Sequence, residues 1–391
     1  MPLVSVVIPA YNAERFIRET LDSVLEQTYR NIEVIVVDDG SCDRTAEIVA
    51  SYAQRDRRII LLQQTNQGVA AARNLAIQLA RGEFIAPVDA DDVWYPQKLE
   101  KQVQCFLEAD DSIGLVYTWS VDIDDQGNLT GGYHARSLEG NALIALTYTN
   151  FLGHASVPLI RRCCFEKAGY YDPQLRAQNA EGCEDIDLYL RIAEYYQFRV
   201  VPEFLMEYRR TNGSMSCNWH RMLKSHLLVH EKIKQKYSLP QFVYRWSDSS
   251  HYLYVLYRCH LSNSHWEVLQ WFAKLLLFDP VVTLHLGLLK LVFVSFLKLS
   301  FNLLSQKLFL SCKNWMSFKR DSKLAKARKK TIIEIEEMRR RTENIPWWQL
   351  RYYLLNRRWQ VVKELSQKTV FNLNSAPNPS QISTQLGEKI L

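Results

Sequence analysis

Short apolar runs alternate with stretches of helical periodicity along the first 120 residues. Most of the apolar runs are rich in β-branched residues, which is typical of buried strands. They span Val4 to Ile8, Ile32 to Val37, Ile59 to Leu62 and Phe84 to Val88. Between them, apolar positions recur every three or four residues and predict helices over 14–25, 45–52 and 69–80. This alternation predicts an α/β fold with a mostly parallel sheet covered by helices on both faces.

The pattern changes twice further along the chain. Residues 115–215 mix strand and helix signals, and their clearest element is a helix from Glu184 to Glu194. After residue 220 the periodicity is helical, and Trp271 to Leu310 is strongly apolar. We therefore expect four regions: an α/β domain over 1–220, a helical apolar region over 221–310, a basic helical region over 311–371 and a disordered polar tail over 372–391.

Composition and charge narrow the class of protein. Of the 391 residues, 47% are hydrophobic and 23% are charged, which excludes a wholly disordered, collagen-like or coiled-coil protein. The net charge of +6 is uneven, because Lys and Arg outnumber Asp and Glu by nine between residues 313 and 358. A basic segment of this kind favours an anionic partner, membrane lipid before nucleic acid. Eight scattered cysteines without a CxxC pair, and an N-terminus without a signal-peptide pattern, predict a cytoplasmic protein with reduced thiols.

Two carboxylates follow the last apolar run of the α/β region. Asp89 and Asp91 are two residues apart, so they lie on one side of an extended backbone. Carboxylate oxygens in this arrangement suit Mg²⁺ or Mn²⁺ bound to a diphosphate. The alternative is an ordinary Asp-rich turn. No GxGxxG or P-loop pattern is present, so phosphate binding would have to use other groups.

Tyr11 and Asp39 follow the first and second strands, so they should lie at the same edge of the sheet as the two carboxylates. An aromatic face there can stack on a base, an interaction worth roughly 1–3 kcal/mol. A carboxylate can accept a hydrogen bond from the imide N–H of uracil or thymine. The alternatives are ordinary packing for Tyr11 and an ordinary turn for Asp39.

Glu184 and Asp185 begin the helix that the pattern predicts after residue 183. Acidic residues in a first helical turn often only cap the helix or interact with its dipole. The functional alternative is a general base, for which a neighbouring carboxylate would raise the otherwise low pKa of an Asp.

Four segments, in order, resemble the motifs of the family 2 inverting glycosyltransferases with the GT-A fold: VSVVIPAYNAERFI, VVDDGSCDRT, NQGVAAARNLAIQLARGEFIAPVDADD and GCEDIDLYLRIAE. The resemblance covers about residues 1–215 and implies a GT-A domain with a C-terminal helical extension. It also implies a role for each matching residue. Pro9, Ala10, Tyr11 and Asp39 would bind the nucleoside, Arg73 and Glu184 would lie beside the nucleotide sugar, Asp89 and Asp91 would hold Mg²⁺ or Mn²⁺, and Asp185 would be the catalytic base.

The resemblance further implies transfer of a sugar, with inversion, from a nucleoside-diphosphate donor to an acceptor hydroxyl. UDP-sugar is the first expectation for the donor, followed by dTDP-sugar, and GDP-sugar stays open. The acceptor would be a cell-surface glycan or a lipid-linked glycan. The chain departs from the family at Thr211, where many members have His. A nucleotidyltransferase and a non-enzymatic membrane- or nucleic-acid-binding protein are the alternatives.

Two further patterns lie outside the resemblance. His226 and His230 have the i, i+4 spacing of metal ligands, but a helix surface or core position is favoured, and the role of His154 stays open.

Polar residues between 281 and 310, including Lys290 and Lys298, form one stripe on an otherwise apolar helix. We expect this helix to lie on the inner surface of the cell membrane without spanning it; burial in a helical subdomain is the alternative.

Overall fold

The computed structural model describes residues 1–211, 218–307, 331–343 and 350–368. The chain divides into two compact units. Among the described residues, the first contains Met1–Tyr237, Thr331–Glu336 and 363–368, and the second contains helices between Ser238 and Val362. The polar tail expected over 372–391 lies outside the described residues, as does the first part of the basic region.

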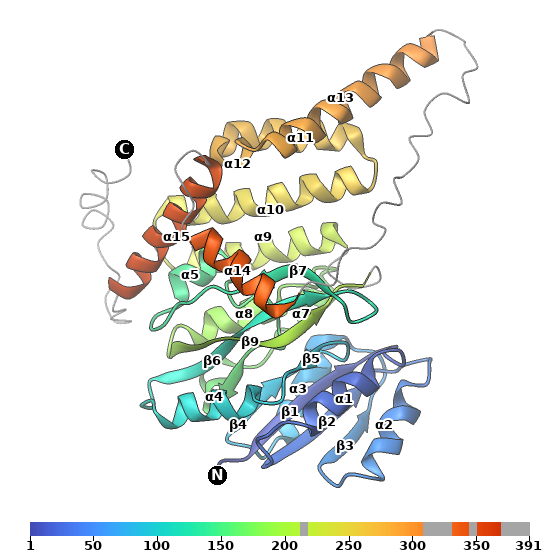
Figure 1. The fold of residues 1–391 in the computed structure, drawn as a ribbon, viewed down its shortest axis with the longest axis vertical. Coiled ribbons are helices and arrows are strands. Elements are labelled where there is room, and N and C mark those ends of the chain that lie inside the picture. Colours follow the sequence, from blue (N-terminus) through green and yellow to red (C-terminus); the bar gives the residue numbers. More distant parts are fainter. Residues whose placement is uncertain (212–217, 308–330, 344–349, 369–391) are drawn as a thin grey trace. The chain divides into compact units, whose positions relative to one another are not determined.

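Four strands form the parallel half of the sheet in the first unit (Figure 1). They are β1 (Val4–Ala10), β2 (Ile32–Asp38), β3 (Ile59–Gln63) and β4 (Phe84–Pro87), in the order β3-β2-β1-β4. Every residue of β1 and β2 is buried, as the apolar runs predict. β1 continues past Pro9, because the Ala10 carbonyl accepts a hydrogen bond of 2.8 Å from the Asp39 N–H.

Three helices connect these strands: α1 (Ile17–Leu25), α2 (Thr45–Ala53) and α3 (Val69–Leu79). The chain adds β2 and β3 on one side of β1 and then crosses back to add β4 on the other side. Because such crossovers are right-handed, α1 and α2 cover one face of the sheet and α3 covers the other. α1 begins later than residue 14, since the Ala13 and Glu14 N–H groups donate to Thr45 and Asp43 side chains.

The other half of the sheet adds antiparallel strand pairs, so the sheet as a whole is mixed. Its strands are β5 (Val93–Trp94), β6 (Ile113–Ile123), β7 (Leu129–His134), β8 (Leu159–Arg161) and β9 (Gln197–Arg209). β8 pairs antiparallel with both β4 and β6, and only β6 and β9 run parallel here. A short turn joins β6 to β7, which forces these two strands to be antiparallel.

Helices of the first unit beyond β4 are α4 (Lys98–Leu107), α5 (Leu143–Tyr148), α6 (Cys163–Ala168), α7 (Gln174–Ala177), α8 (Glu184–Ile192) and α9 (Trp219–Lys236). By its contacts α9 belongs to this unit, which extends to Tyr237. Lys232 pairs with Asp172 at 2.7 Å and Lys236 with Glu194 at 2.6 Å. These ion pairs hold α9 against the α/β layer.

Helices of the second unit are α10 (Gln241–Leu261), α11 (His265–Phe278), α12 (Pro280–Thr283) and α13 (Leu286–Lys307). α14 (Ile332–Glu343) and α15 (Leu350–Lys368) each contribute to both units. A buried ion pair joins Arg358 of α15 to Asp279, through nitrogen–oxygen distances of 2.6 and 2.7 Å. Asp279 also accepts a hydrogen bond from the Ser249 hydroxyl.

The single helix expected over 281–310 is interrupted at Leu284 and His285. The His285 ring accepts a hydrogen bond of 3.2 Å from the Leu288 N–H, so this side chain caps the start of α13. None of the helices in the described ranges is both long and apolar enough to span a membrane. The six cysteines that these ranges contain are free thiols, as expected from their spacing.

Candidate active site

The site expected from the sequence lies where the direction of strand addition reverses. β1 is flanked by β2 on one side and by β4 on the other, and all three strands run parallel. In open α/β sheets this reversal leaves a crevice at the carboxyl ends of the strands, where ligands bind. Tyr11 follows β1, Asp39 follows β2 and Asp89 lies shortly after β4. The structure therefore brings these three residues to one edge of the sheet.

Tyr11 and Asp39 have different surroundings at this edge. Tyr11 is 51% exposed, so its ring is available for stacking, whereas Pro9 and Ala10 before it are buried in β1. Asp39 is buried and accepts three hydrogen bonds of 2.7 Å, from the Gln64 amide and from backbone N–H groups at the start of α3. A carboxylate has about four acceptor positions, so these three hydrogen bonds leave one unused, with the Arg176 guanidinium 3.9 Å from the carboxylate.

Three carboxylates are crowded after β4, at Asp89, Asp91 and Asp92. Burial, and secondarily the charge of Asp89, raises the pKa of Asp91 to about 6. Burial and the two neighbouring carboxylates raise the pKa of Asp92 well above its usual value. Negative charge in this segment is therefore incompletely neutralised by the protein, which is the condition under which a bound divalent cation is stabilising. The donor set of carboxylate oxygens fits Mg²⁺ or Mn²⁺.

Arg73 lies on α3 and neutralises part of this charge. Its guanidinium is buried and forms an ion pair with the Asp89 carboxylate. Burial disfavours the charged form, but the attraction of Asp89 outweighs it and the pKa of Arg73 is raised. The Tyr171 ring lies 5.1 Å from the guanidinium carbon, so an aromatic face also supports the cation. Arg73 therefore stays positively charged next to the carboxylates. Its ion pair compensates the negative charge of Asp89, so Asp91 is the predicted metal ligand with the less compensated charge.

The first turn of α8 adds Glu184 and Asp185. Asp185 accepts hydrogen bonds from the Ile186 N–H at 2.8 Å and from the Asn150 amide at 3.3 Å. Burial raises the pKa of Asp185, Arg73 lowers it and Asp89 raises it, so these three groups share one electrostatic environment. A carboxylate held by two donors, with a raised pKa, can accept a proton from a bound hydroxyl.

Glu184 points back along the chain instead. Both of its carboxylate oxygens lie about 3 Å from the Gly182 N–H, at 2.9 and 3.0 Å. Burial raises the pKa of Glu184 to about 7. These contacts place its carboxylate on the backbone that precedes α8, whose first turn has no side-chain cap.

Sequence reasoning missed the groups that hold the carboxylates in place. The Asp89 N–H donates to the Ser156 hydroxyl at 2.9 Å, and this hydroxyl donates to Asp92 at 2.5 Å. Arg209, fully buried at the end of β9, donates from its backbone to Asp92 and from its side chain to the Asp91 carbonyl. The segment YRR before Thr211 was the available signal for Arg209, and the residues that follow Thr211 in that loop lie outside the described ranges.

The two histidines with helical spacing lie apart from these groups in the chain. His226 and His230 are both buried on α9, with ring centroids 3.9 Å apart. This position agrees with the core alternative that their spacing favoured.

Comparisons with known proteins match this arrangement. A family model described as "Glycosyl transferase family 2" matches residues 5–167. An uncharacterized glycosyltransferase of Methanocaldococcus jannaschii is 33% identical over 215 residues, which cover 54% of this chain and 72% of that protein. A Bacillus subtilis protein named "Putative teichuronic acid biosynthesis glycosyltransferase TuaG" is 33% identical over 241 residues, which cover 60% of this chain and 89% of that protein.

Two solved structures share the fold. Residues 1–349 of S. aureus TarS, in complex with UDP-GlcNAc, align with a TM-score of 0.52 and 19% identity over 72% of this chain and 82% of that one. The mannosyltransferase PcManGT of Pyrobaculum calidifontis, in complex with GDP-Man and Mn²⁺, aligns with a TM-score of 0.50 and 22% identity over 75% and 84%. The sheet topology, the family model and the two relatives agree with one another. The chain therefore belongs to glycosyl transferase family 2, has the GT-A fold and is a glycosyltransferase.

Proposed function

We propose that the protein transfers one sugar from a nucleoside-diphosphate donor to an acceptor hydroxyl, with inversion at the anomeric carbon. The observation that carries this proposal is the shared environment of Asp185, Arg73 and Asp89 at the reversal point of the sheet. The influence of both charges on Asp185 supports a basic carboxylate close to the groups suited to a diphosphate.

The chemistry assigns one task to each group. Asp185 takes the proton of the acceptor hydroxyl while that oxygen bonds to the anomeric carbon and the bond from this carbon to the diphosphate oxygen breaks on the opposite face. Asn150 orients the Asp185 carboxylate. Asp91, with Asp89 beside it, would hold Mg²⁺ or Mn²⁺, which in such sites neutralises charge developing on a departing diphosphate. Arg73 adds a fixed positive charge next to Asp89.

The nucleoside would bind at the ends of β1 and β2. Tyr11 offers an exposed ring for stacking, Pro9 and Ala10 form the strand end below it, and Asp39 keeps one acceptor position. A uracil imide N–H fits that acceptor, so a UDP-sugar is our first choice of donor. TarS binds UDP-GlcNAc and PcManGT binds GDP-Man, which supports a nucleotide sugar as the class of donor.

For the acceptor we propose a glycan of the cell envelope, free or lipid-linked. The name of the Bacillus subtilis relative, which refers to teichuronic acid biosynthesis, supports this class. A lipid-linked acceptor would require the enzyme to work at the cytoplasmic surface of the membrane. The exposed apolar side chains of α13 are the feature that supports such a location: Leu286, Leu289, Phe293, Phe296 and Leu297.

A donor screen tests the proposal. The full chain is incubated with UDP-, dTDP- and GDP-sugars, with Mn²⁺ or with a chelator, and release of nucleoside diphosphate is measured. We expect release from a UDP-sugar that stops in chelator and returns with added cation. Pyrophosphate release would instead indicate nucleotidyl transfer and would contradict the proposal.

Asp91→Asn is the matched variant, because a neutral amide is a poor ligand for Mg²⁺ or Mn²⁺. It should lose most turnover while keeping the circular dichroism spectrum of the native chain. Asp111→Asn, at a fully exposed carboxylate in the loop before β6, should keep turnover and serves as the control. Full activity of Asp91→Asn, or of the native chain in chelator, would rule out metal dependence.

A further inference from the structure

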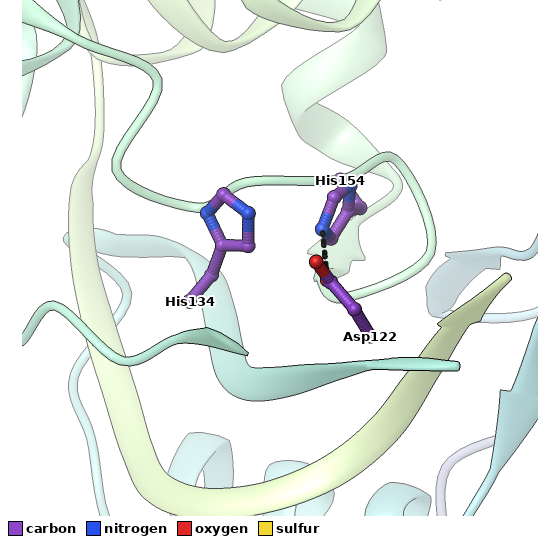
Figure 2. Close-up of side chains that lie close together, drawn as sticks. All are labelled: Asp122, His134 and His154. Atoms are coloured by element: carbon purple, nitrogen blue, oxygen red, sulfur yellow. Dashed lines mark ion pairs between the residues drawn. The ribbon is translucent and has the colours of Figure 1, made fainter. Parts of the chain in front are cut away.

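Three metal-ligating side chains meet within the first unit, outside the groups assigned above. They are Asp122 of β6, His134 of β7 and His154 of the segment after α5 (Figure 2). One ligand atom from each lies within 4.8 Å of the other two. Asp122 Oδ1 and His154 Nε2 are 3.9 Å apart, and the two imidazole rings meet edge to face with centroids 4.5 Å apart.

The hairpin register explains how the strands place two of these residues. His134 pairs directly with Ser120 across the β6–β7 ladder, so it projects to the same face as Ser120 and Asp122. Two glycines lie where a side chain would come too close to these groups. A Cβ at Gly132 would lie 2.1 Å from the Asp122 carboxylate, and a Cβ at Gly153 would lie 2.8 Å from the His134 ring. Side chains at these two positions would collide with Asp122 and with His134.

Two of the ligand atoms are buried without a hydrogen-bond partner among the described residues. They are Asp122 Oδ1 and His154 Nε2, whose side chains are only 2% and 10% exposed. Their separation of 3.9 Å is too long for a hydrogen bond between them. A neutral imidazole has one ring nitrogen whose lone pair can bind a metal ion. Unpaired acceptors that face one another are better explained by a cation than by packing.

Neighbouring groups hold the three side chains in this orientation. Arg210 pairs with Asp122 Oδ2 at 2.7 Å, which leaves Oδ1 facing the histidines. The Tyr208 ring stacks on His154 with centroids 3.6 Å apart and an interplanar angle of 9°. Metal-binding carboxylates and imidazoles commonly have such supporting contacts, which set the direction of the ligand atom.

We propose that Asp122, His134 and His154 bind a transition-metal dication of the Zn²⁺ class, at a site separate from the aspartates after β4. Two imidazole nitrogens and one carboxylate oxygen suit Zn²⁺, whereas Mg²⁺ prefers oxygen ligands alone. With three protein ligands, a fourth position is available for water or another donor. In tetrahedral coordination the ligand atoms are about 3.3 Å apart, so the present spacing needs only a small contraction.

The proposed metal site is close in the chain to residues that contact Asp185 and the aspartates after β4. His154 lies between Asn150, which contacts Asp185, and Ser156, which contacts Asp89 and Asp92. A metal ion on His154 would therefore fix the segment that holds the base and the carboxylates. The proposal does not depend on the reaction proposed above, because binding can be measured without a sugar donor.

Direct metal binding tests the proposal. The full chain carrying Asp91→Asn, which removes a carboxylate of the other site, is stripped with chelator and titrated with Co²⁺ and then with Zn²⁺. We expect one equivalent of Co²⁺ with the visible absorption bands of a nitrogen- and oxygen-ligated ion, displaced by Zn²⁺. Zn²⁺ should also raise the melting temperature.

Added to that background, His134→Gln and His154→Gln should each weaken Co²⁺ binding beyond the roughly 10–100-fold expected for loss of a supporting contact. His220→Gln, at an exposed histidine of α9, should bind as before. The melting temperature without metal shows whether each variant is folded, and His134→Gln alone suffices if His154→Gln does not fold. Absence of Co²⁺ binding, or binding that both variants leave unchanged, would overturn the proposal.

Discussion

Asp185 has an environment unlike that of an ordinary surface carboxylate. It lies in the first turn of α8, where two N–H donors hold its oxygens and burial raises its pKa. Hydrogen bonds from Asn150 and Ile186 favour the charged form, whereas burial and Asp89 favour the neutral form. This balance keeps the group able to gain and lose a proton, which is what a general base requires.

Asp185→Asn is expected to lower kcat by roughly 10²-fold or more, because an amide cannot accept the acceptor proton. Binding of the nucleoside diphosphate should be nearly unchanged, since Asn keeps the size and one acceptor oxygen. In the native chain kcat should rise with pH through the raised pKa of this group, because only the ionised form is active. Steady-state kinetics over pH and calorimetric titration with UDP measure the two effects. A variant with native turnover would move the role to another residue.

Glu184 gives a prediction about stability rather than turnover. The unfolded chain releases its proton near pH 4.5, but the folded protein keeps it up to about pH 7. Between these values the folded state binds more protons, so the contribution of Glu184 to stability falls as the pH rises. Glu184→Gln should therefore raise the melting temperature at pH 7.5 and change it little at pH 5. Thermal denaturation in chelator at both pH values measures this, and an equal shift at both would contradict it.

The sequence pattern predicts the position of a site residue only where the residues next to it in the chain determine that position. Asp89 and Asp91 could be predicted as a pair because they directly follow an apolar strand. Arg209 could not be joined to them, because it lies 118 residues from Asp91 and reaches it through the pairing of β9 with β5 and β6. The cluster of Asp122, His134 and His154 combines the β6–β7 hairpin with a residue of the segment after α5, and the local sequence does not indicate this meeting.

At the scale of elements, the Asp279–Arg358 pair fastens α15 to the other helices of the second unit. Both side chains are buried, and the guanidinium also lies 4.9 Å from the Trp246 ring centre. Removing one partner of a buried ion pair leaves an uncompensated charge, which costs about 3–5 kcal/mol.

Arg358→Met is therefore expected to lower the free energy of unfolding of this unit by about that amount. The double variant Arg358→Met with Asp279→Asn should recover part of the loss, because the remaining group is neutral. Urea denaturation followed by circular dichroism compares the three proteins. An unchanged midpoint for Arg358→Met would show that the pair contributes little to stability.

Some helices and strands can be predicted from their own sequence, and others cannot. The buried strands β1 and β2 and helix α3 agree with their apolar patterns to within a few residues, because each pattern records burial directly. The interruption before α13 was missed, since it depends on a histidine side chain that caps a helix rather than on proline or glycine. The sequence did not indicate which strand pairs run antiparallel, because an apolar strand reads the same in either direction.

At the scale of the whole molecule, α13 is the feature that supports the proposed membrane location. Phe293 and Phe296 are 60% and 54% exposed, and Lys290 and Lys298 on the same helix are also exposed. An apolar helix face beside lysines is typical of a helix that lies in the interface of a membrane. The basic excess between residues 313 and 358 adds roughly 1 kcal/mol of attraction to anionic lipid for each charge near the surface.

Flotation with liposomes tests this location. We expect the full chain to float with anionic vesicles at low salt and to float less at high salt, because salt screens the basic segment. Phe293→Ser with Phe296→Ser should reduce flotation at low salt. Leu107→Ser, at a similarly exposed leucine of α4, should float like the native chain. A native chain that stays in the aqueous fraction with anionic vesicles at low salt would contradict the membrane location.

The short segment from Asn150 to Ser156 limits how this enzyme could be redesigned. One end of it contacts Asp185, the proposed base, and the other end bonds to the Asp89 backbone N–H and to the Asp92 carboxylate. A library that varied this segment to admit new acceptors would disturb proton removal and leaving-group departure together, so most of its members would be inactive whatever sugar they could accommodate. Acceptor range would have to be engineered from residues that approach the crevice without carrying either of these contacts.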